Sequence, residues 1–132
     1  MYSFSKRSQR RLDSCDARLR EVFEEVIKYR DCSVLEGHRD EERQNELKRQ
    51  GFSKLSYPLS KHNVSPSLAV DVSPYPIDWT NLPRFTYFAG FVMGIAASKG
   101  IKLRWGGDWN MNNDIKDERF LDFVHFEVLG ER

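Results

Sequence analysis

Histidine is the residue type with the clearest chemical meaning in this chain, which contains only three of them. His62, in SKHNVSPSLAVD, is followed by an aspartate, and His125, in DFVHFEV, is preceded by one. Imidazole nitrogens and carboxylate oxygens are common zinc ligands, and a catalytic zinc usually takes three ligands from the protein and leaves a fourth position open. Two histidines and one aspartate would suffice, so the sequence predicts a small zinc hydrolase.

The third ligand follows from strand alternation. Residues 68–73 alternate so that Val70 and Val72 can face a core while Asp71 projects from the other face. In residues 124–128, His125 and Glu127 share one face by the same rule. Asp71 and His125 can therefore point toward one open face of a sheet, where a shared metal site becomes possible.

Two further residues supply the remaining chemistry of a hydrolase. Asp122 lies three residues before His125 and is the candidate general base, which would take a proton from water that a zinc ion activates. Arg39, in EGHRD, follows a predicted strand, and its guanidinium could stabilise the negative charge of a tetrahedral intermediate. A single aspartate or histidine on a strand is more often structural, so the prediction depends on the combination.

The elements that must hold these residues follow from hydrophobic spacing. We expect amphipathic helices near residues 11–30 and 83–99, a short exposed helix over 40–50, and strands at 32–35, 68–73, 101–105 and 124–128. Long loops cover residues 52–67, which contain His62, and 106–120. This pattern predicts an α+β fold, with a small antiparallel sheet, the two large helices on one face and the metal on the other. The expected core is Val22, Phe23, Val70, Val72, Phe85, Phe88, Val92 and Ile95.

The composition fits one domain over residues 1–132 and narrows the function. Hydrophobic residues make up 39%, charged residues 31%, and the net charge is +1, which is typical of a globular protein and gives no general reason to expect nucleic acid. The basic N-terminal stretch is interpreted as a solvated end. Cys15 and Cys32 have no close partner in sequence and are expected to be free, buried thiols. No signal peptide or membrane span is predicted, and we expect a monomer made in the cytoplasm.

The same residues resemble a known family, the zinc D-alanyl-D-alanine and L-alanyl-D-glutamate peptidases of peptidoglycan, and most closely its phage endolysins. The shared features are an SxH segment leading to an A-x-D strand, a late DxxHxE segment, an arginine after an early strand and a tryptophan-containing loop. Here they correspond to Ser60, His62, Ala69, Asp71, Asp122, His125, Glu127, Arg39 and the WGGDWN stretch of residues 105–110. The resemblance covers nearly the whole chain.

The resemblance implies a hedgehog/D,D-peptidase-like fold with zinc held by His62, Asp71 and His125. Asp122 would be the base and Arg39 would stabilise the substrate carbonyl. The implied substrate is the stem peptide of bacterial peptidoglycan, reached from the host cytoplasm only at lysis. The family usually has a shorter segment with a glycine between histidine and aspartate, whereas this chain has SPS there, so the loop must bulge. His38 is expected to be structural or peripheral.

A second metal pattern lies in DWNMNNDIKDE. Alternating oxygen ligands followed by a carboxylate are typical of a calcium loop, and the candidate ligands are Asp108, Asn110, Asn112, Asp114 and Glu118. Asn113 stands where a calcium loop has glycine, although asparagine tolerates left-handed backbone geometry. The alternative is a solvated loop whose Asn and Asp residues only make turns. If calcium binds, it would order the segment that leads to Asp122 and His125.

The sequence leaves alternative functions open. The leading hypothesis is an endopeptidase that cleaves between L-alanine and D-glutamate as a phage lysis enzyme. A D,D-carboxypeptidase or dipeptidase of the same family is the nearest alternative, and a noncatalytic wall- or metal-binding module is another. Asp122 favours an enzyme, because a binding module has little need of a carboxylate beside the zinc ligands.

Overall fold

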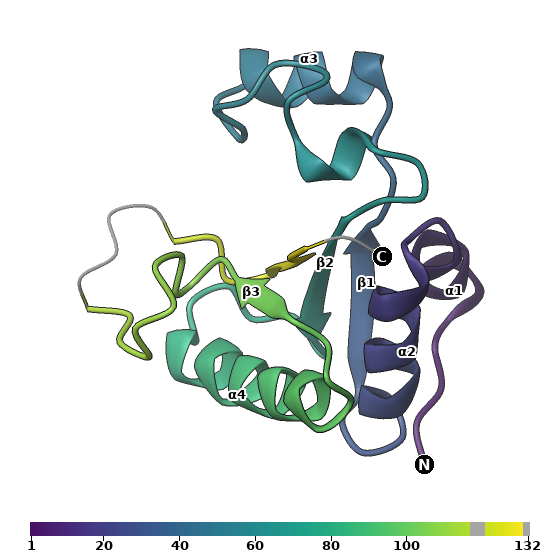
Figure 1. Cartoon of the computed structure of the whole chain (residues 1–132), viewed down its shortest axis with the longest axis vertical. Coiled ribbons are helices and arrows are strands. Elements are labelled where there is room, and N and C mark those ends of the chain that lie inside the picture. The colour runs from purple at the N-terminus through teal and green to yellow at the C-terminus, as the bar shows by residue number, and fades with distance from the viewer. Residues whose placement is uncertain (117–120, 131–132) are drawn as a thin grey trace.

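A four-stranded antiparallel sheet forms the centre of the computed structural model, which describes residues 1–116 and 121–130 (Figure 1). Its strands are β1 (Cys32–Glu36), β2 (Ala69–Pro74), β3 (Leu103–Trp105) and β4 (His125–Val128), in the order β1-β2-β4-β3. All of the pairings are antiparallel, as the sequence predicts. The strands β2 and β4, which were expected to carry Asp71 and His125, are therefore neighbours at the middle of the sheet.

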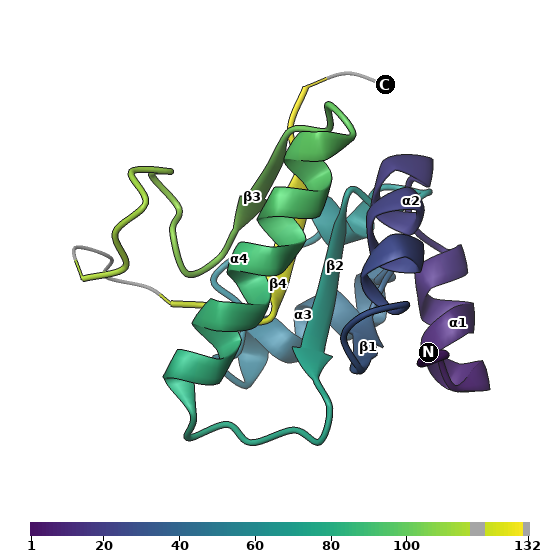
Figure 2. The same cartoon turned by 90° about the horizontal axis from the view of Figure 1, so that it is seen from below.

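Two helices, α2 (Ala17–Val26) and α4 (Leu82–Ser98), pack on one face of this sheet and on each other. Figure 2 shows both helices in front of the strands and α3 (Glu41–Arg49) behind them. The core lies beneath α2 and α4, where the Phe126 ring has its centroid 5.4 Å from that of Phe23 and 6.4 Å from that of Phe88. The predicted core residues are buried here, except that Ile95 is only half-buried against the same cluster.

The prediction of a single helix over residues 11–30 is wrong, because the chain forms two helices there. α1 (Lys6–Asp13) ends at Ser14, and α2 begins after Asp16, whose side chain accepts a hydrogen bond from the backbone N–H of Arg18. An aspartate in this position stabilises a new helix start. The apolar spacing runs through the break because Leu12, Cys15 and Leu19 all stay buried.

On the other face of the sheet, α3 and the short 3-10 helix η1 (Lys61–Asn63) form a separate lobe (Figure 1). The sequence predicted α3 as an exposed helix, but Gln44 and Leu47 are buried. The helix therefore has a buried face, which its mostly charged sequence does not indicate. The lobe and the sheet face each other across the residues expected to bind metal.

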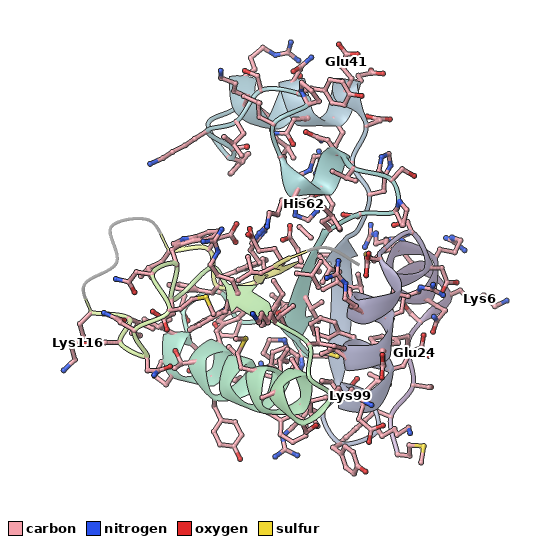
Figure 3. All side chains as sticks on the ribbon, in the orientation of Figure 1. Lys6, Glu24, Glu41, His62, Lys99 and Lys116 are labelled. Atoms are coloured by element: carbon pink, nitrogen blue, oxygen red, sulfur yellow. The ribbon has the colours of Figure 1, made fainter. Side chains whose placement is uncertain are left out.

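The positions of the side chains follow from this arrangement of layers. Figure 3 shows the labelled charged residues Lys6, Glu24 and Lys116 at the outside of the molecule, whereas His62 lies between the lobe and the sheet. Within the described residues, no helix is both long and apolar enough to cross a membrane.

The two buried thiols should be chemically inert in the folded protein. Burial raises the pKa of both Cys15 and Cys32 to about 12. We expect a disulfide reagent at pH 8 to label the folded chain at least about 100-fold more slowly than the denatured chain, because the thiolate is the reactive form.

The same shift predicts a pH effect on stability. Because the folded pKa lies above the unfolded value of about 8.5, the free energy of unfolding should be unaffected by the thiols below that pH. It should fall between about pH 8.5 and 12, by roughly 1.4 kcal/mol per pH unit for each thiol. Denaturant unfolding at several pH values measures this fall. In the labelling experiment above, equal rates for folded and denatured protein would contradict the burial of both cysteines.

Candidate metal centre and active site

The pairing of β2 with β4 places Asp71 directly opposite His125. Since alternate residues face opposite sides of a strand, Val70 and Phe126 enter the core while Asp71 and His125 point toward the lobe. Asp71 Oδ1 lies 3.4 Å from His125 Nδ1. The sheet register alone therefore brings together two of the three predicted ligands.

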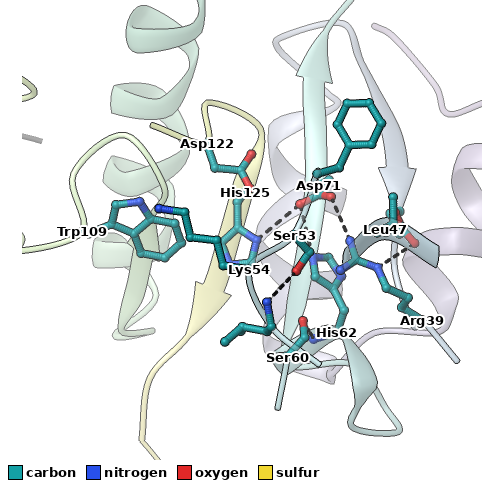
Figure 4. Close-up of a pocket in the computed structure, with 13 residues that line it drawn as sticks. Arg39, Leu47, Ser53, Lys54, Ser60, His62, Asp71, Trp109, Asp122 and His125 are labelled. Atoms are coloured by element: carbon teal, nitrogen blue, oxygen red, sulfur yellow. Dashed lines mark hydrogen bonds and ion pairs between the residues drawn. The ribbon is translucent and has the colours of Figure 1, made fainter. Parts of the chain in front are cut away.

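The third predicted ligand, His62, comes from η1 in the lobe. Ser60 caps this short helix by accepting a hydrogen bond from the His62 backbone N–H, and Asn63 accepts one from the Ser60 N–H. His62 Nε2 reaches to 3.3 Å from Asp71 Oδ1. Ligand atoms from His62, Asp71 and His125 all lie within 4.8 Å of one another, so the structure assembles the predicted cluster (Figure 4).

The longer segment between His62 and Asp71 is accommodated as the sequence predicts, by a bulge. Val64 and Ser65 are exposed, and the chain returns at Ser67, whose N–H donates to the carbonyl of Ser14 and whose carbonyl accepts from the N–H of Asp16. The extra residues thus project outward without displacing His62.

Each imidazole is oriented by a partner on its other nitrogen. His62 Nδ1 lies 2.8 Å from the Gly37 carbonyl oxygen, and since a carbonyl only accepts, Nδ1 carries the hydrogen and Nε2 presents its lone pair to the cluster. Both His62 Nε2 and Asp71 Oδ1 are buried and have no hydrogen-bond partner among the described residues. Buried polar atoms are normally paired. Their nitrogen and oxygen donors therefore fit a metal such as zinc.

His125 is oriented by Glu127, whose Oε1 lies 2.9 Å from His125 Nε2. The other carboxylate oxygen of Glu127 is 3.0 Å from the Lys61 ammonium and 2.7 Å from the Arg104 guanidinium. Burial alone would raise the pKa of Glu127, but His125, Lys61 and Arg104 lower it to about 2. Glu127 is thus a fixed negative charge that keeps Nδ1 of His125 directed at Asp71.

The charges of the cluster influence one another. Burial opposes the ionisation of Asp71, yet His62 and His125 beside it hold the pKa of this carboxyl well below its ordinary value. Burial also opposes protonation of His125, but Asp71 and Glu127 raise its pKa to about 9. The carboxylates of Asp71 and Glu127 therefore favour a cation at His125, for which a proton and a metal would compete.

Asp122 stands at the edge of this cluster (Figure 4). Its backbone N–H donates to the Gly106 carbonyl and its carbonyl accepts from the N–H of His125. A side chain at Gly106 would overlap Asp122, so this close approach requires glycine. Burial, followed by the charge of Asp71, raises the pKa of Asp122 above its ordinary value, as suits a carboxylate that exchanges protons.

Arg39 is buried beside Asp71, its Nη2 lying 3.7 Å from Asp71 Oδ2. Its Nε donates to Glu36 at 2.9 Å and its Nη1 donates to Gln44 at 2.8 Å. The guanidinium is therefore held in place at the cluster. His38, next to it in sequence, is exposed and outside the cavity, in agreement with a peripheral position.

A cavity of about 400 Å³ surrounds the cluster and includes residues that sequence reasoning missed. Trp109 lies with its ring centroid 5.3 Å from that of His125. The lobe contributes Leu47, Phe52, Lys54 and Leu55 to the opposite wall. Only Trp109 had a signal, the WGGDWN stretch, because the lobe residues have no motif and depend on how α3 folds back.

The predicted calcium loop is described in part, and Glu118 lies outside the described residues. Asp108 accepts hydrogen bonds from the N–H groups of Asn112 and Asn113, and Asn112 accepts one from Asp114. Asn113 has φ 67°, the left-handed geometry that asparagine was expected to tolerate. These bonds form the turns of the alternative interpretation, and they bring several of the candidate oxygens into one short loop.

Comparisons with known proteins agree with this site. Residues 1–129 match the model of a protein family described as phage L-alanyl-D-glutamate peptidase. The chain is 28% identical over 122 residues to the L-alanyl-D-glutamate peptidase of Escherichia phage T5, covering 89% of this chain and 88% of that protein. It also resembles the crystal structure of the Serratia marcescens L-Ala D-Glu endopeptidase ChiX, with a TM-score of 0.74 and 28% identity over 96% of this chain and 90% of that one. The chain therefore belongs to the phage L-alanyl-D-glutamate peptidase family.

Proposed function

We propose that this chain, a peptidoglycan endopeptidase of the phage L-alanyl-D-glutamate peptidase family, works with a zinc ion held by His62, Asp71 and His125. The observation that carries the proposal is the pair of buried atoms His62 Nε2 and Asp71 Oδ1, which find no hydrogen-bond partner in the part of the chain that the structure describes. His62 Nδ1 already bonds to the Gly37 carbonyl, so Nε2 is left for a ligand role.

When bound, zinc would supply Lewis acidity and activate water for attack on a carbonyl. Asp122, which lines the same cavity, would take a proton from the attacking water and return it to the leaving amine. Arg39, fixed by Glu36 and Gln44, would place positive charge near the substrate carbonyl oxygen. The scissile bond would be that between L-alanine and D-glutamate in the stem peptide, cleaved when the enzyme reaches the wall from the host cytoplasm at lysis.

Digestion of purified peptidoglycan by the zinc-loaded protein tests this function. We expect mass analysis to find new D-glutamate amino termini. Asp122→Asn keeps the shape of the side chain but cannot accept the proton, so it should lower kcat by about 10²- to 10⁴-fold, while zinc content measured by atomic absorption stays unchanged.

Other results of the digestion would indicate one of the alternative functions. Release of D-alanine alone would indicate the D,D-carboxypeptidase alternative, and intact stems with bound zinc would indicate a binding module. Full activity of Asp122→Asn would overturn the assignment of the base.

Glu127 orients His125, so its loss should weaken the candidate metal site. Because ligand orientation by outer partners commonly affects metal affinity by about 10- to 100-fold, Glu127→Ala should weaken zinc binding by that factor. Glu127→Gln, which can still accept a hydrogen bond from Nε2, should weaken it less. Competition with a chromophoric chelator measures both, with the exposed helical residue Glu24 changed to alanine as a control. Unchanged zinc affinity in Glu127→Ala would exclude the orienting role.

We also propose that the loop containing Asp108, Asn110, Asn112, Asp114 and Glu118 binds calcium. Its support is the left-handed Asn113 and the convergence of the N–H groups of Asn112 and Asn113 on Asp108. Calorimetric titration with calcium should show binding to the wild type and none to Asp108→Ala. Because Trp109 in this loop lies against His125, calcium should also change the cleavage rate. A titration without heat and without any rate change would remove the proposal.

A further inference from the structure

The charges on the cavity wall leave one cation without a role in the reaction described above. The described lining contains the carboxylates Glu36, Asp71 and Asp122, and the cations Arg39 and Lys54 besides the two imidazoles. The three ligand residues and Asp122 serve the metal and the proton transfer. Lys54 lies on the opposite wall, which belongs to the lobe.

Arg39 is engaged with the protein itself. Its Nε bonds to Glu36, its Nη1 to Gln44, and its Nη2 lies 3.7 Å from Asp71. The single positive charge of this guanidinium offsets only part of the charge of Glu36 and Asp71. A further negative charge on the substrate therefore needs another cation.

The substrate brings that negative charge. D-glutamate has two carboxyl groups, and whichever of them continues the stem peptide, the other remains free beside the scissile bond. With the proposed zinc bound, its two positive charges and that of Arg39 would only balance the three carboxylates of the lining. A further carboxylate from the substrate would still lack a compensating cation in a partly buried site, which is unfavourable. The apolar lobe residues Leu47 and Leu55 cannot supply the compensation.

The backbone on both sides of Lys54 is fixed to α3. Gln44, which is fully buried, donates through Nε2 to Ser53 Oγ at 3.0 Å and to the Leu55 carbonyl at 2.6 Å. The Ser53 N–H donates to the Leu47 carbonyl. Figure 4 shows the Lys54 side chain running from this segment in the direction of Trp109, which lines the other side of the cavity. A long, flexible ammonium is thus tethered by a rigid base at the cavity mouth.

We propose that Lys54 forms a carboxylate subsite, in which its ammonium binds the free carboxylate of the D-glutamate residue on the leaving side of the scissile bond. This assignment rests on the proposed endopeptidase function. It makes Lys54 a specificity residue that selects glutamate over its uncharged carboxamide.

Two synthetic stem peptides that differ in one group test the subsite. One contains L-alanyl-D-glutamate with its free carboxylate, and the other has a carboxamide in that place. We expect the wild type to cleave the carboxylate peptide with a kcat/KM roughly 10-fold higher, a size typical of an ion pair at a partly exposed site. Lys54→Met should lose this preference, mainly through a higher KM for the carboxylate peptide, because charge binding acts on substrate and transition state alike.

Two variants provide controls. Lys54→Arg keeps the positive charge and should retain most of the preference. Lys48→Met removes a lysine of the same lobe that bonds to Ser56 outside the cavity, and it should leave both rates unchanged. Calorimetry with the D-glutamate-containing product should give weaker binding to Lys54→Met than to Lys48→Met.

The outcomes distinguish failure of the endopeptidase function from failure of the Lys54 subsite. If the wild type cleaves neither peptide, the endopeptidase function is overturned, and the subsite with it. If the wild type cleaves both peptides equally, or if Lys54→Met slows both equally, the endopeptidase function stands and the subsite is wrong.

Discussion

The antiparallel register between β2 and β4 is the constraint on which the rest of this structure depends. It sets Asp71 opposite His125 and, one position along, Val70 opposite Phe126. A slip of one residue would turn every side chain of the strand to the other face. Asp71 would then enter the core, where an unpaired charge costs several kcal/mol, and Phe126 would leave its contacts with Phe23 and Phe88. The register that builds the candidate metal centre is thus the one that stabilises the fold.

The orientation of the imidazoles extends this constraint to parts of the chain far from the candidate metal centre. His62 depends on the Gly37 carbonyl, and a side chain at Gly37 would overlap the carbonyl of Arg11 in α1. α1 in turn is joined to β1, because Ser8 accepts from the Val34 N–H and Arg11 donates to the Val34 carbonyl. A helix with no residue in the cavity therefore helps to position a candidate ligand. On the other side, Lys61 links η1 to Glu127 and so connects the supports of both histidines.

The features that could be predicted from the sequence are those in which polar and apolar residues repeat regularly over a short segment. Alternation in residues 68–73 and 124–128 was enough to place Asp71 and His125 on one face, since a strand repeats every second residue. His62 has no such pattern, and its prediction came from the scarcity of histidine and the aspartate that follows it, with the family resemblance in support. The break between α1 and α2 was missed because the apolar spacing continues through it, although the N-cap Asp16 was a signal. Gln44 and Lys54 could not be predicted, because their roles depend on α3 folding back over the sheet.

Gln44 explains why this lobe can act as a fixed wall of the cavity. It is fully buried, and its amide oxygen accepts from Arg39 while its amide nitrogen donates to Ser53 and Leu55. A buried amide without these partners would be costly, so the lobe is stable only when Arg39 and residues 53–55 are both in place. Arg39 is also tied to η1, because Asn63 donates to its carbonyl and its own N–H donates to the carbonyl of His62. The candidate ligand His62, Arg39 and the cavity wall formed by the lobe consequently share one hydrogen-bond network. The lobe is therefore a preorganised part of the site rather than a lid, since moving it away from the sheet would break the bonds that hold His62 and Arg39.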